Sequence, residues 1–421
     1  PLSNLSTGSQ ALHYGVYELA LTAPDAPANP YTGAHLRVTF TRPDGRQSTV
    51  EGFYDGVAAT GGALYRARAY CDTRGTWRWQ SQSNLPPLDA QSSTFEVIPS
   101  TLRGKLRVHS DDPYQFATDD GQWFLHVGDT GYRYVTATEP EWQAYLDQAV
   151  QMGATKIRTW FCQARSDVQV LFGETRDTLN LAYWQEIDRR LCWALERHPD
   201  VVFKLIPYGE DTAELCRYDA GDADSARIAQ YAQARFSALP NVYWCISNDR
   251  EIVLDETQPL EGRQVYARTI DRIGREMAAR ELWGTLLTNH QCRWSGYAFV
   301  DAPWSDLITL EDIDQVDGAI LGAYRAQSAA AGRPAPVVND EDRYELYRPP
   351  AHPRYFFRRL MWGSLLSGGH ATYGGLYTYQ PYEQDSLNGV RGYYDAVREN
   401  KLQGGADDFG HIHRFFRESG L

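Results

Sequence analysis

The stretch VVFKLIPYGEDTAELCRYDAGDADSARIAQYAQARFSALPNVYWCISND, residues 201–249, indicates the fold of the larger part of the chain. It begins with an apolar run at Val201–Ile206, continues through a helical pattern at Asp224–Leu239, and ends with an apolar run at Val242–Ile246. Short apolar runs that alternate with amphipathic helices are typical of parallel strands joined by crossover helices. The stretch therefore predicts one strand–helix–strand unit of an α/β fold, with polar residues following each strand.

The same alternation continues on both sides of this unit. Eight strands are expected in all, at Trp123–Val127, Lys156–Trp160, Val201–Ile206, Val242–Ile246, Trp283–Thr288, Leu307–Leu310, Pro336–Val338 and Ala371–Tyr373. Six helices are expected between them, at Glu139–Met152, Leu181–His198, Asp224–Leu239, Glu261–Arg280, Gln315–Ala331 and Arg354–Leu366. This count over roughly 300 residues predicts a (β/α)8 TIM barrel. A doubly wound sheet is the competing fold, but no glycine-rich phosphate loop follows the first strand.

The first hundred residues show a different pattern, with period-two alternation and no helical spacing. Short strands are expected at Tyr14–Leu21, Leu36–Phe40, Gln47–Phe53, Leu64–Tyr70, Thr76–Gln80 and Ser93–Val97. Strands at roughly ten-residue spacing, separated by Gly, Pro and Asp turns, predict an antiparallel β-sandwich. The pattern changes near Pro99–Lys105, so we expect an N-terminal sandwich of residues 1–102 and a catalytic barrel of residues 103–421.

Composition limits the classes of partner. The chain of 421 residues has 41 Lys and Arg against 54 Asp and Glu, a formal charge of −13, which argues against a nucleic-acid partner. No apolar stretch approaches the ~18 residues of a membrane span, so no membrane partner is expected. The 12 Trp, 27 Tyr and 15 Phe suit a large aromatic core, and some could stack on sugar rings. Six cysteines without a CxxC pair are expected to be mostly free thiols. With no signal peptide in this sequence, a cytoplasmic or a periplasmic location is expected.

Two carboxylates lie where a barrel carries its chemistry, just past the C-terminal ends of the strands. Asp249 follows the fourth expected strand and Glu341 follows the seventh. Cleavage of a glycosidic bond needs two such groups, one to protonate the leaving oxygen and one to attack, or activate water, at the anomeric carbon. The pair therefore predicts a glycosidase, although each residue alone could be a solvated loop acid.

Other polar and aromatic residues at the expected strand ends are candidates for binding the substrate. They are Asp129, Arg158, Trp160, Tyr208, Asn248, His290, Tyr344 and His370. Each also has a structural interpretation, as a turn cap, an ion-pair partner or a core side chain. No metal site is expected, because the pair His411-Ile-His413 lacks a third ligand at useful spacing. No cofactor is expected.

Several motifs resemble glycoside hydrolase family 140 and its relatives in the domain-of-unknown-function 4038 group. The segment Asn241-Val-Tyr-Trp-Cys-Ile-Ser-Asn-Asp249-Arg250 resembles their N-x-x-W-x-x-G-G/N-D-R signature, and Gly128-Asp129-Thr130 resembles the start of their G-D-T-A-W segment. Pro336-Val-Val-Asn-Asp-Glu341-Asp-Arg-Tyr344-Glu345 is similar to their P-V-x-x-x-E-P-x-Y-E. The N-terminal part resembles the sandwich, of domain-of-unknown-function 5060 type, that often precedes such barrels. The chain departs from the pattern at Ser247-Asn248, where relatives often have two glycines, and at Asp342, where they often have proline.

The resemblance implies Asp249 as the acid/base and Glu341 as the nucleophile of an apiosidase-like enzyme. It implies a retaining, exo-acting hydrolase that removes a terminal sugar, such as a furanoside, from an oligosaccharide or polysaccharide. Three alternatives stay open: an inverting hydrolase, a transglycosylase with the same carboxylates, and a barrel that binds sugar without catalysis. Assembly into a homo-oligomer through the sandwich also stays open.

Overall fold

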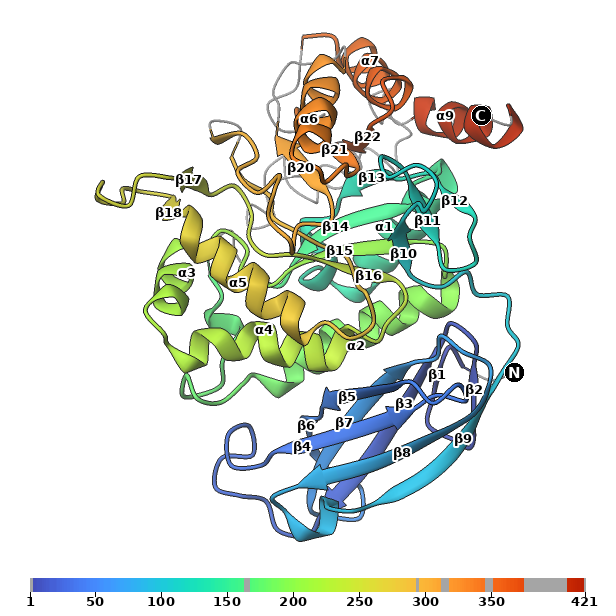
Figure 1. Ribbon diagram of the computed structural model, residues 1–421, viewed down its shortest axis with the longest axis vertical. Helices are drawn as coiled ribbons and strands as arrows, with labels where there is room; N and C mark the ends of the chain where they lie inside the picture. Colours follow the sequence, from blue (N-terminus) through green and yellow to red (C-terminus); the bar gives the residue numbers. More distant parts are fainter. Residues whose placement is uncertain are drawn as a thin grey trace.

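The computed structural model describes residues 3–162, 167–292, 295–311, 318–344, 351–374 and 407–419. A β-sandwich formed by the first hundred residues lies against a larger body of strands and helices (Figure 1). Among the helices of the described segments, none has both the length and the apolar character required to cross a membrane.

The sandwich consists of two sheets whose inner faces share one aromatic core. The first sheet has the order β1 (Leu5–Ser6), β3 (Val16–Ala23), β7 (Ala63–Tyr70), β6 (Phe53–Val57). The second has the order β2 (Gln10–Leu12), β9 (Ser92–Ile98), β8 (Gly75–Ser83), β4 (Leu36–Thr41), β5 (Gln47–Glu51). The long strands pair antiparallel, whereas the short β1 and β2 pair parallel with β3 and β9. Alternate residues of β4 and β8 are buried, as expected for strands with one face on a core.

The single strand expected at Gln47–Phe53 is two strands, because the chain changes sheets at Gly52. β5 ends at Glu51 and β6 begins at Phe53 in the opposite sheet. A Cβ at Gly52 would lie 2.6 Å from Leu36 Cδ2 and 3.0 Å from the Arg66 carbonyl oxygen. Only glycine leaves room for this close crossing.

Eight parallel strands form the barrel, which confirms the predicted fold class. Their order is β19 (Leu287–Thr288), β16 (Val242–Cys245), β15 (Val202–Ile206), β14 (Lys156–Trp160), β13 (Val127–Thr130), β22 (His370–Tyr373), β21 (Val337–Glu341), β20 (Ile308–Glu311). Every neighbouring pair in this order is parallel. Side-chain hydroxyls join the two ends of the sheet: Thr288 Oγ1 donates to the Leu307 carbonyl (2.7 Å) and Thr309 Oγ1 to the Asn289 carbonyl (2.6 Å).

Helices surround the barrel. They are α1 (Glu139–Met152), α2 (Leu181–Arg197), α3 (Thr212–Asp219), α4 (Ala223–Phe236), α5 (Ala267–Arg280), α6 (Ala319–Ala330) and α7 (Pro353–Leu366), with α9 (Asp407–Glu418) near the C-terminus. α3 was not expected, and α5 begins later than expected because Gln264–Tyr266 forms β18 beside β17 (Glu251–Val253).

The first expected barrel strand also lies elsewhere than predicted. Trp123–Phe124 is β12 of a small sheet with β10 (Leu106–Val108) and β11 (Phe116–Thr118), and the barrel strand β13 starts at Val127. Leu106, Phe116 and Phe124 of this sheet pack with Val202 and Val338 at the N-terminal ends of barrel strands. The small sheet therefore closes the bottom of the barrel with apolar side chains.

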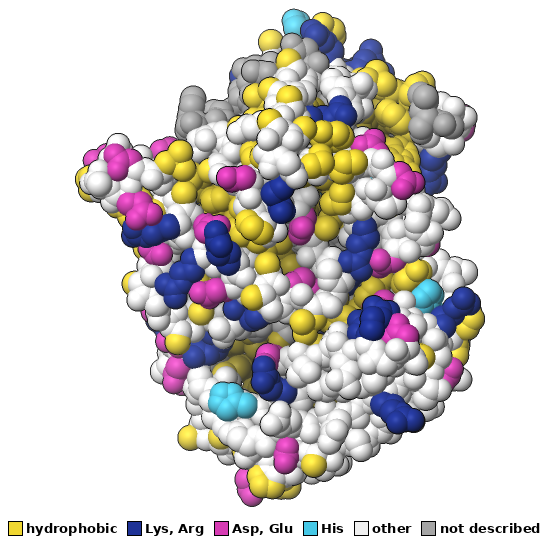
Figure 2. All heavy atoms as spheres, in the orientation of Figure 1, with side chains coloured by type: hydrophobic (Ala, Val, Ile, Leu, Met, Phe, Trp, Pro, Cys, Tyr) yellow, Lys and Arg dark blue, Asp and Glu magenta, His cyan; other side chains and the backbone are white. Residues whose placement is uncertain are grey.

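Buried ion pairs hold the sandwich against the barrel. Arg68 of β7 lies 2.7 Å from Asp188 of α2, and Arg235 of α4 lies 2.9 Å from Asp188 and 2.8 Å from Asp55 of β6. Burial alone would raise the pKa of Asp188, but Arg68 and Arg235 together lower it, so this shared carboxylate stays ionised. On the face shown in Figure 2, acidic and basic side chains are interspersed over both domains.

Candidate active site

Glu341 is the last residue of β21 and is held by three donors at the C-terminal end of the barrel. The Tyr344 hydroxyl donates to its Oε1 (2.7 Å), while Arg158 Nη2 (2.5 Å) and the Tyr132 hydroxyl (3.2 Å) donate to its Oε2. Burial alone would raise the pKa of Glu341, but the Arg158 guanidinium, His290 and the Tyr344 hydrogen bond hold it well below its usual range. Glu341 is therefore an ionised carboxylate with a fixed orientation.

Asp249 follows β16 in a strained backbone conformation. Its φ is +49°, in the left-handed region that residues other than glycine rarely adopt, and it is 3% exposed. The preceding segment is fixed, since the Asn248 amide donates to the Gly209 carbonyl (2.7 Å) and the Ser247 amide to Asn289 Oδ1 (3.1 Å). Strained residues of this kind concentrate at functional sites because the surrounding structure has to stabilise them.

One imidazole lies between the two carboxylates. His290 Nε2 is 3.0 Å from Asp249 Oδ1 and 3.3 Å from Glu341 Oε2. These two oxygens can therefore be no further apart than the sum of the two distances, 6.3 Å. Burial and Arg158 lower the pKa of His290, but contacts with Asp249, Asp340 and Glu341 outweigh them and raise it to about 10. The imidazole is thus a cation that joins the carboxylates at neutral pH.

A β-bulge explains why two successive residues of β21 both reach this cluster. Leu310 of β20 pairs with Asn339, but the next residue, Glu311, pairs with Glu341, so Asp340 is the extra residue. On a regular strand, Asp340 and Glu341 would point to opposite faces. A bulge re-aims side chains, and here both carboxylates contact Arg158.

Arg158 and Asn248 connect the cluster to the loop after β15. Arg158 Nη2 donates to Asn248 Oδ1 (2.5 Å), and Asn248 Nδ2 donates to Glu210 Oε1 (3.2 Å). Arg250 forms an ion pair with Glu210 (3.2 Å) and donates to Thr212 Oγ1 (2.7 Å). The Arg250 side chain therefore points toward the loop after β15.

Tyr132 is a member of the cluster that the sequence analysis missed. Its ring stacks on Trp160 with centroids 4.0 Å apart and planes 11° apart, and its hydroxyl accepts a hydrogen bond from Arg158. Trp160 therefore lies behind Tyr132, which separates it from the carboxylates. The only sequence signal for Tyr132 is its place three residues after Asp129, past the end of β13.

Besides Trp160, three expected substrate contacts lie outside the cluster. Asp129 accepts a hydrogen bond from Tyr145 of α1 (2.6 Å), and the Tyr208 hydroxyl donates to the Ser225 carbonyl of α4 (2.8 Å), so both side chains face the helices. His370 begins β22 near the bottom of the barrel, where its Nε2 lies 3.1 Å from the Tyr114 carbonyl. Burial lowers the pKa of His370 to about 4, which makes it a neutral side chain.

Three groups of the cluster could also approach a metal ion. Asp249, His290 and Glu311 each place one ligand atom within 4.8 Å of the other two. However, the Arg158 guanidinium lies 4.0 Å from Asp249 Oδ1, and a positive charge so close to this carboxylate disfavours a metal cation beside it. We therefore interpret these residues as part of an organic binding site. Glu345, which the sequence motif includes, lies outside the described residues.

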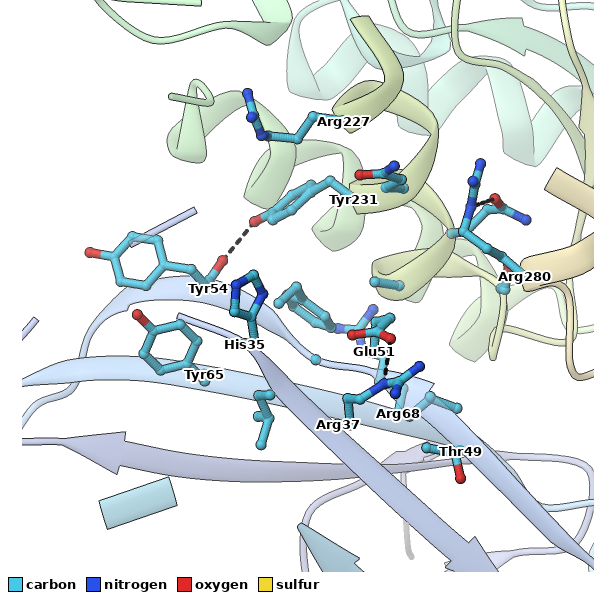
Figure 3. Close-up of a pocket in the computed structure, with 18 of the residues that line it drawn as sticks. His35, Arg37, Thr49, Glu51, Tyr54, Tyr65, Arg68, Arg227, Tyr231 and Arg280 are labelled. Atoms are coloured by element: carbon cyan, nitrogen blue, oxygen red, sulfur yellow. Dashed lines mark hydrogen bonds and ion pairs between the residues drawn. The ribbon is translucent and has the colours of Figure 1, made fainter. Parts of the chain in front are cut away.

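A cleft of about 600 Å³ lies between the sandwich and helices α4 and α5 (Figure 3). One hydrogen bond crosses the cleft between the domains, from the Tyr231 hydroxyl of α4 to the Tyr54 carbonyl of β6 (2.7 Å), and within the barrel domain Arg280 Nε of α5 donates to Gln233 Oε1 of α4 (3.0 Å). No residue of the carboxylate cluster lines this cleft. The cleft therefore lacks the pair of carboxylates, and the candidate catalytic site is the C-terminal rim of the barrel.

Solved structures with a similar fold are glycoside hydrolases by description. A candidate glycoside hydrolase from Bacteroides vulgatus ATCC 8482 is 18% identical, with a TM-score of 0.75 over 97% of this chain and 79% of that chain. A family 5 glycoside hydrolase from the same organism is 16% identical, with a TM-score of 0.54 over 74% of this chain and 72% of that chain. At these identities, the likeness shows a shared fold. A search of curated proteins found no match.

Family models cover both domains. Residues 10–84 match the domain of unknown function DUF5060. Residues 110–421, which include the carboxylate cluster, match the model described as the apiosidase-like catalytic domain. The chain therefore belongs to the apiosidase-like family and is a glycosidase with a TIM-barrel catalytic domain.

Proposed function

We propose that this glycosidase is a retaining hydrolase, with Glu341 as nucleophile and Asp249 as acid/base. The observation that carries the proposal is the 6.3 Å limit on the distance between their nearest oxygens. Retaining sites have carboxyl groups about 5–5.5 Å apart, whereas inverting sites need about 6.5–9.5 Å to admit a water molecule. The limit applies to one pair of oxygens, Asp249 Oδ1 and Glu341 Oε2, and it favours the closer, retaining spacing.

The environment of Glu341 suits its proposed role. Glu341 is kept ionised and oriented by Arg158, Tyr132 and Tyr344, as a nucleophile requires. In the first step, Glu341 bonds to the anomeric carbon while Asp249 gives its proton to the departing glycosidic oxygen. In the second step, Asp249 takes a proton from water, whose oxygen displaces Glu341 from the anomeric carbon.

We propose an exo-acting enzyme that removes a terminal sugar, a furanoside by analogy with the apiosidase-like family, from an oligosaccharide or polysaccharide. The family description supports the sugar class. Asn248, Arg158, His290 and Tyr344 are the expected substrate contacts that lie in the cluster with the two carboxylates. We further propose that residues 1–102 act as an accessory domain fixed to the barrel by the Arg68–Asp188–Arg235 ion pairs.

The test compares hydrolysis of aryl glycosides and oligosaccharides with terminal pentofuranoses by the wild type and by Glu341→Gln. Proton NMR of the first-formed product gives the anomeric configuration. A 2-fluoro sugar with a good leaving group should label Glu341, seen by peptide mass spectrometry. Inverted product would replace the retaining mechanism, and hydrolysis that survives in Glu341→Gln would remove the nucleophile assignment. Sugar transfer to an added acceptor alcohol would indicate a transglycosylase. Sugar binding without turnover of any substrate would indicate a binding protein.

A further inference from the structure

A buried ionic cluster lies directly beneath the two carboxylates, in the interior of the barrel. Asp340, Lys156 and Lys204 are fully buried there. Lys156 Nζ lies 2.5 Å from Asp340 Oδ1, Lys204 Nζ contacts Asp340 Oδ2, and the Thr372 hydroxyl donates to Asp340 Oδ1 (2.9 Å). The interior of such a barrel is ordinarily filled by branched apolar side chains. The mechanism proposed above uses none of these charges.

Asp340 contacts both cations that hold the reacting carboxylates. Its Oδ2 lies 3.4 Å from His290 Nδ1 and 3.7 Å from Arg158 Nε, and its backbone carbonyl accepts a hydrogen bond from Arg158 Nη1 (2.8 Å). The opposite side of the His290 ring faces Asp249 and Glu341. Asp340 is therefore linked to the site through the imidazole and the guanidinium, and its buried carboxylate does not reach the substrate.

The charged side chains around the His290 imidazole lie on four barrel strands or directly after them. Asp249 follows β16, Asp340 and Glu341 end β21, Arg158 lies on β14, and Glu311 ends β20. Among the described residues, Asp340 faces Nδ1 of the ring, whereas Asp249 and Glu341 face Nε2. A carboxylate at one ring nitrogen fixes the ring plane and its protonation, as in catalytic histidine systems.

We propose that Asp340, itself fixed by Lys156 and Lys204, is a positioning residue that holds the His290 imidazolium between Asp249 and Glu341. This inference rests on the proposed function, because the two carboxylates are the groups being positioned. Lys156 and Lys204 prevent Asp340 from turning, since they bind its two oxygens from two neighbouring strands. The bulge at Asp340 is what brings its side chain and that of Glu341 to the same cluster.

The test uses the double variant Lys204→Met/Asp340→Asn, because the single Asp340→Asn leaves two buried ammonium groups without their carboxylate. Asp188→Asn is the matched control: it removes a carboxylate shared by two buried cations, but at the domain seam. We expect the double variant to lower kcat by about 10- to 100-fold, because a small misplacement of reacting groups has that effect. KM should change by less than about threefold, since Asp340 does not touch the substrate. The acidic limb of the pH profile should move to higher pH, whereas Asp188→Asn keeps the wild-type kcat and pH profile.

A second readout is independent of turnover. Nitrogen NMR of protein labelled with ¹⁵N-histidine, with the His290 signal assigned by its absence in His290→Gln, should show an imidazolium at pH 8 in the wild type. In Lys204→Met/Asp340→Asn, we expect the Nδ1 signal of His290 to shift, because this nitrogen has lost its carboxylate partner. A His290 Nδ1 signal that is unchanged in the double variant overturns the proposal, and so does a kcat within threefold of that of Asp188→Asn. If the wild type hydrolyses no substrate, the proposed function fails, and the NMR signal alone decides whether Asp340 controls His290.

Discussion

Two tyrosine hydroxyls hold the carboxylate of Glu341, so their removal should change the pH dependence of catalysis. The Tyr344 hydroxyl donates to Oε1 at 2.7 Å and the Tyr132 hydroxyl to Oε2 at 3.2 Å. A hydrogen bond to a charged group contributes about 1.5–3 kcal/mol, and about 1.4 kcal/mol corresponds to one pKa unit. Tyr344→Phe should therefore raise the pKa of Glu341 by about one to two units. Tyr132→Phe should have a smaller effect, because its longer bond is shared with Arg158.

The direction of this pH shift depends on which protonation state of Glu341 the two hydroxyls stabilise. Both donate to the ionised carboxylate, so the wild-type pKa of Glu341 is depressed and this proposed nucleophile stays charged in acid. Loss of a donor favours the protonated form, and activity is then lost at a higher pH as the pH falls. The double variant Tyr132→Phe/Tyr344→Phe should move the acidic limb of kcat/KM upward by about two units or more.

The assay is kcat/KM from pH 3 to pH 8, because that ratio reports the free enzyme. Tyr134→Phe is the matched control, since Tyr134 lies in the same short helix as Tyr132 but its hydroxyl donates to the Arg190 carbonyl (2.9 Å). The control should keep the wild-type profile. A folded double variant with an unchanged acidic limb would refute the reasoning, because Glu341 would then not be the group that titrates or the hydroxyls would not stabilise its charge.

Three further predictions concern stability and metal dependence. Asp188→Ala leaves two buried arginines without their shared carboxylate and should lower the free energy of unfolding in urea by about 3–5 kcal/mol; a loss below about 1 kcal/mol would contradict the role of the seam. Gly52→Ala places a Cβ 2.6 Å from a leucine side chain and should cost about 1–3 kcal/mol with kcat unchanged; a wild-type urea midpoint would show that the crossing tolerates a side chain. Treatment with EDTA should leave kcat/KM unchanged, whereas loss of activity that added zinc restores would identify Asp249, His290 and Glu311 as metal ligands.

The barrel was predictable because its signal is a pattern repeated eight times. Each apolar run followed by a helical segment is weak alone, but the count and spacing together exclude most other folds. The same pattern placed Asp249 and the acidic segment that contains Glu341 at one rim, because parallel strands in a closed barrel end there, whereas the choice of Glu341 within that segment came from the family resemblance. Neither inference needed the exact bounds of any strand.

Side-chain direction was not predictable, because it depends on those bounds. Asp129 and Tyr208 lie at the expected strand ends, yet both face the helices, since direction alternates with every residue. The first strand shows how sensitive this is: β13 starts at Val127, where the expected strand ended. His370 is at the bottom of the barrel because it begins β22 rather than ending it.

The bulge at Asp340 also changes side-chain direction, and it was even less predictable from the sequence. It depends on how β20 and β21 align, which the sequence of either strand does not specify. One signal was nevertheless present in the sequence: Lys204 interrupts the apolar run VVFKLI, and a lysine inside a buried strand needs a carboxylate partner. A search for that partner among acids on neighbouring strands would have pointed to the barrel interior.

The energetics of this interior support a functional origin for its charges. Replacing a buried ion pair by apolar side chains of similar volume is often neutral or stabilising by about 1–4 kcal/mol. The neighbouring layer at the bottom of the barrel, with Leu106, Phe116 and Val338, shows that this chain packs apolar residues inside the barrel where no chemistry takes place. Lys156, Lys204 and Asp340 instead occupy a layer that contacts Arg158 and His290. Stability alone does not favour charges at that depth, but the role proposed for Glu341 does, because a nucleophile must stay ionised and oriented.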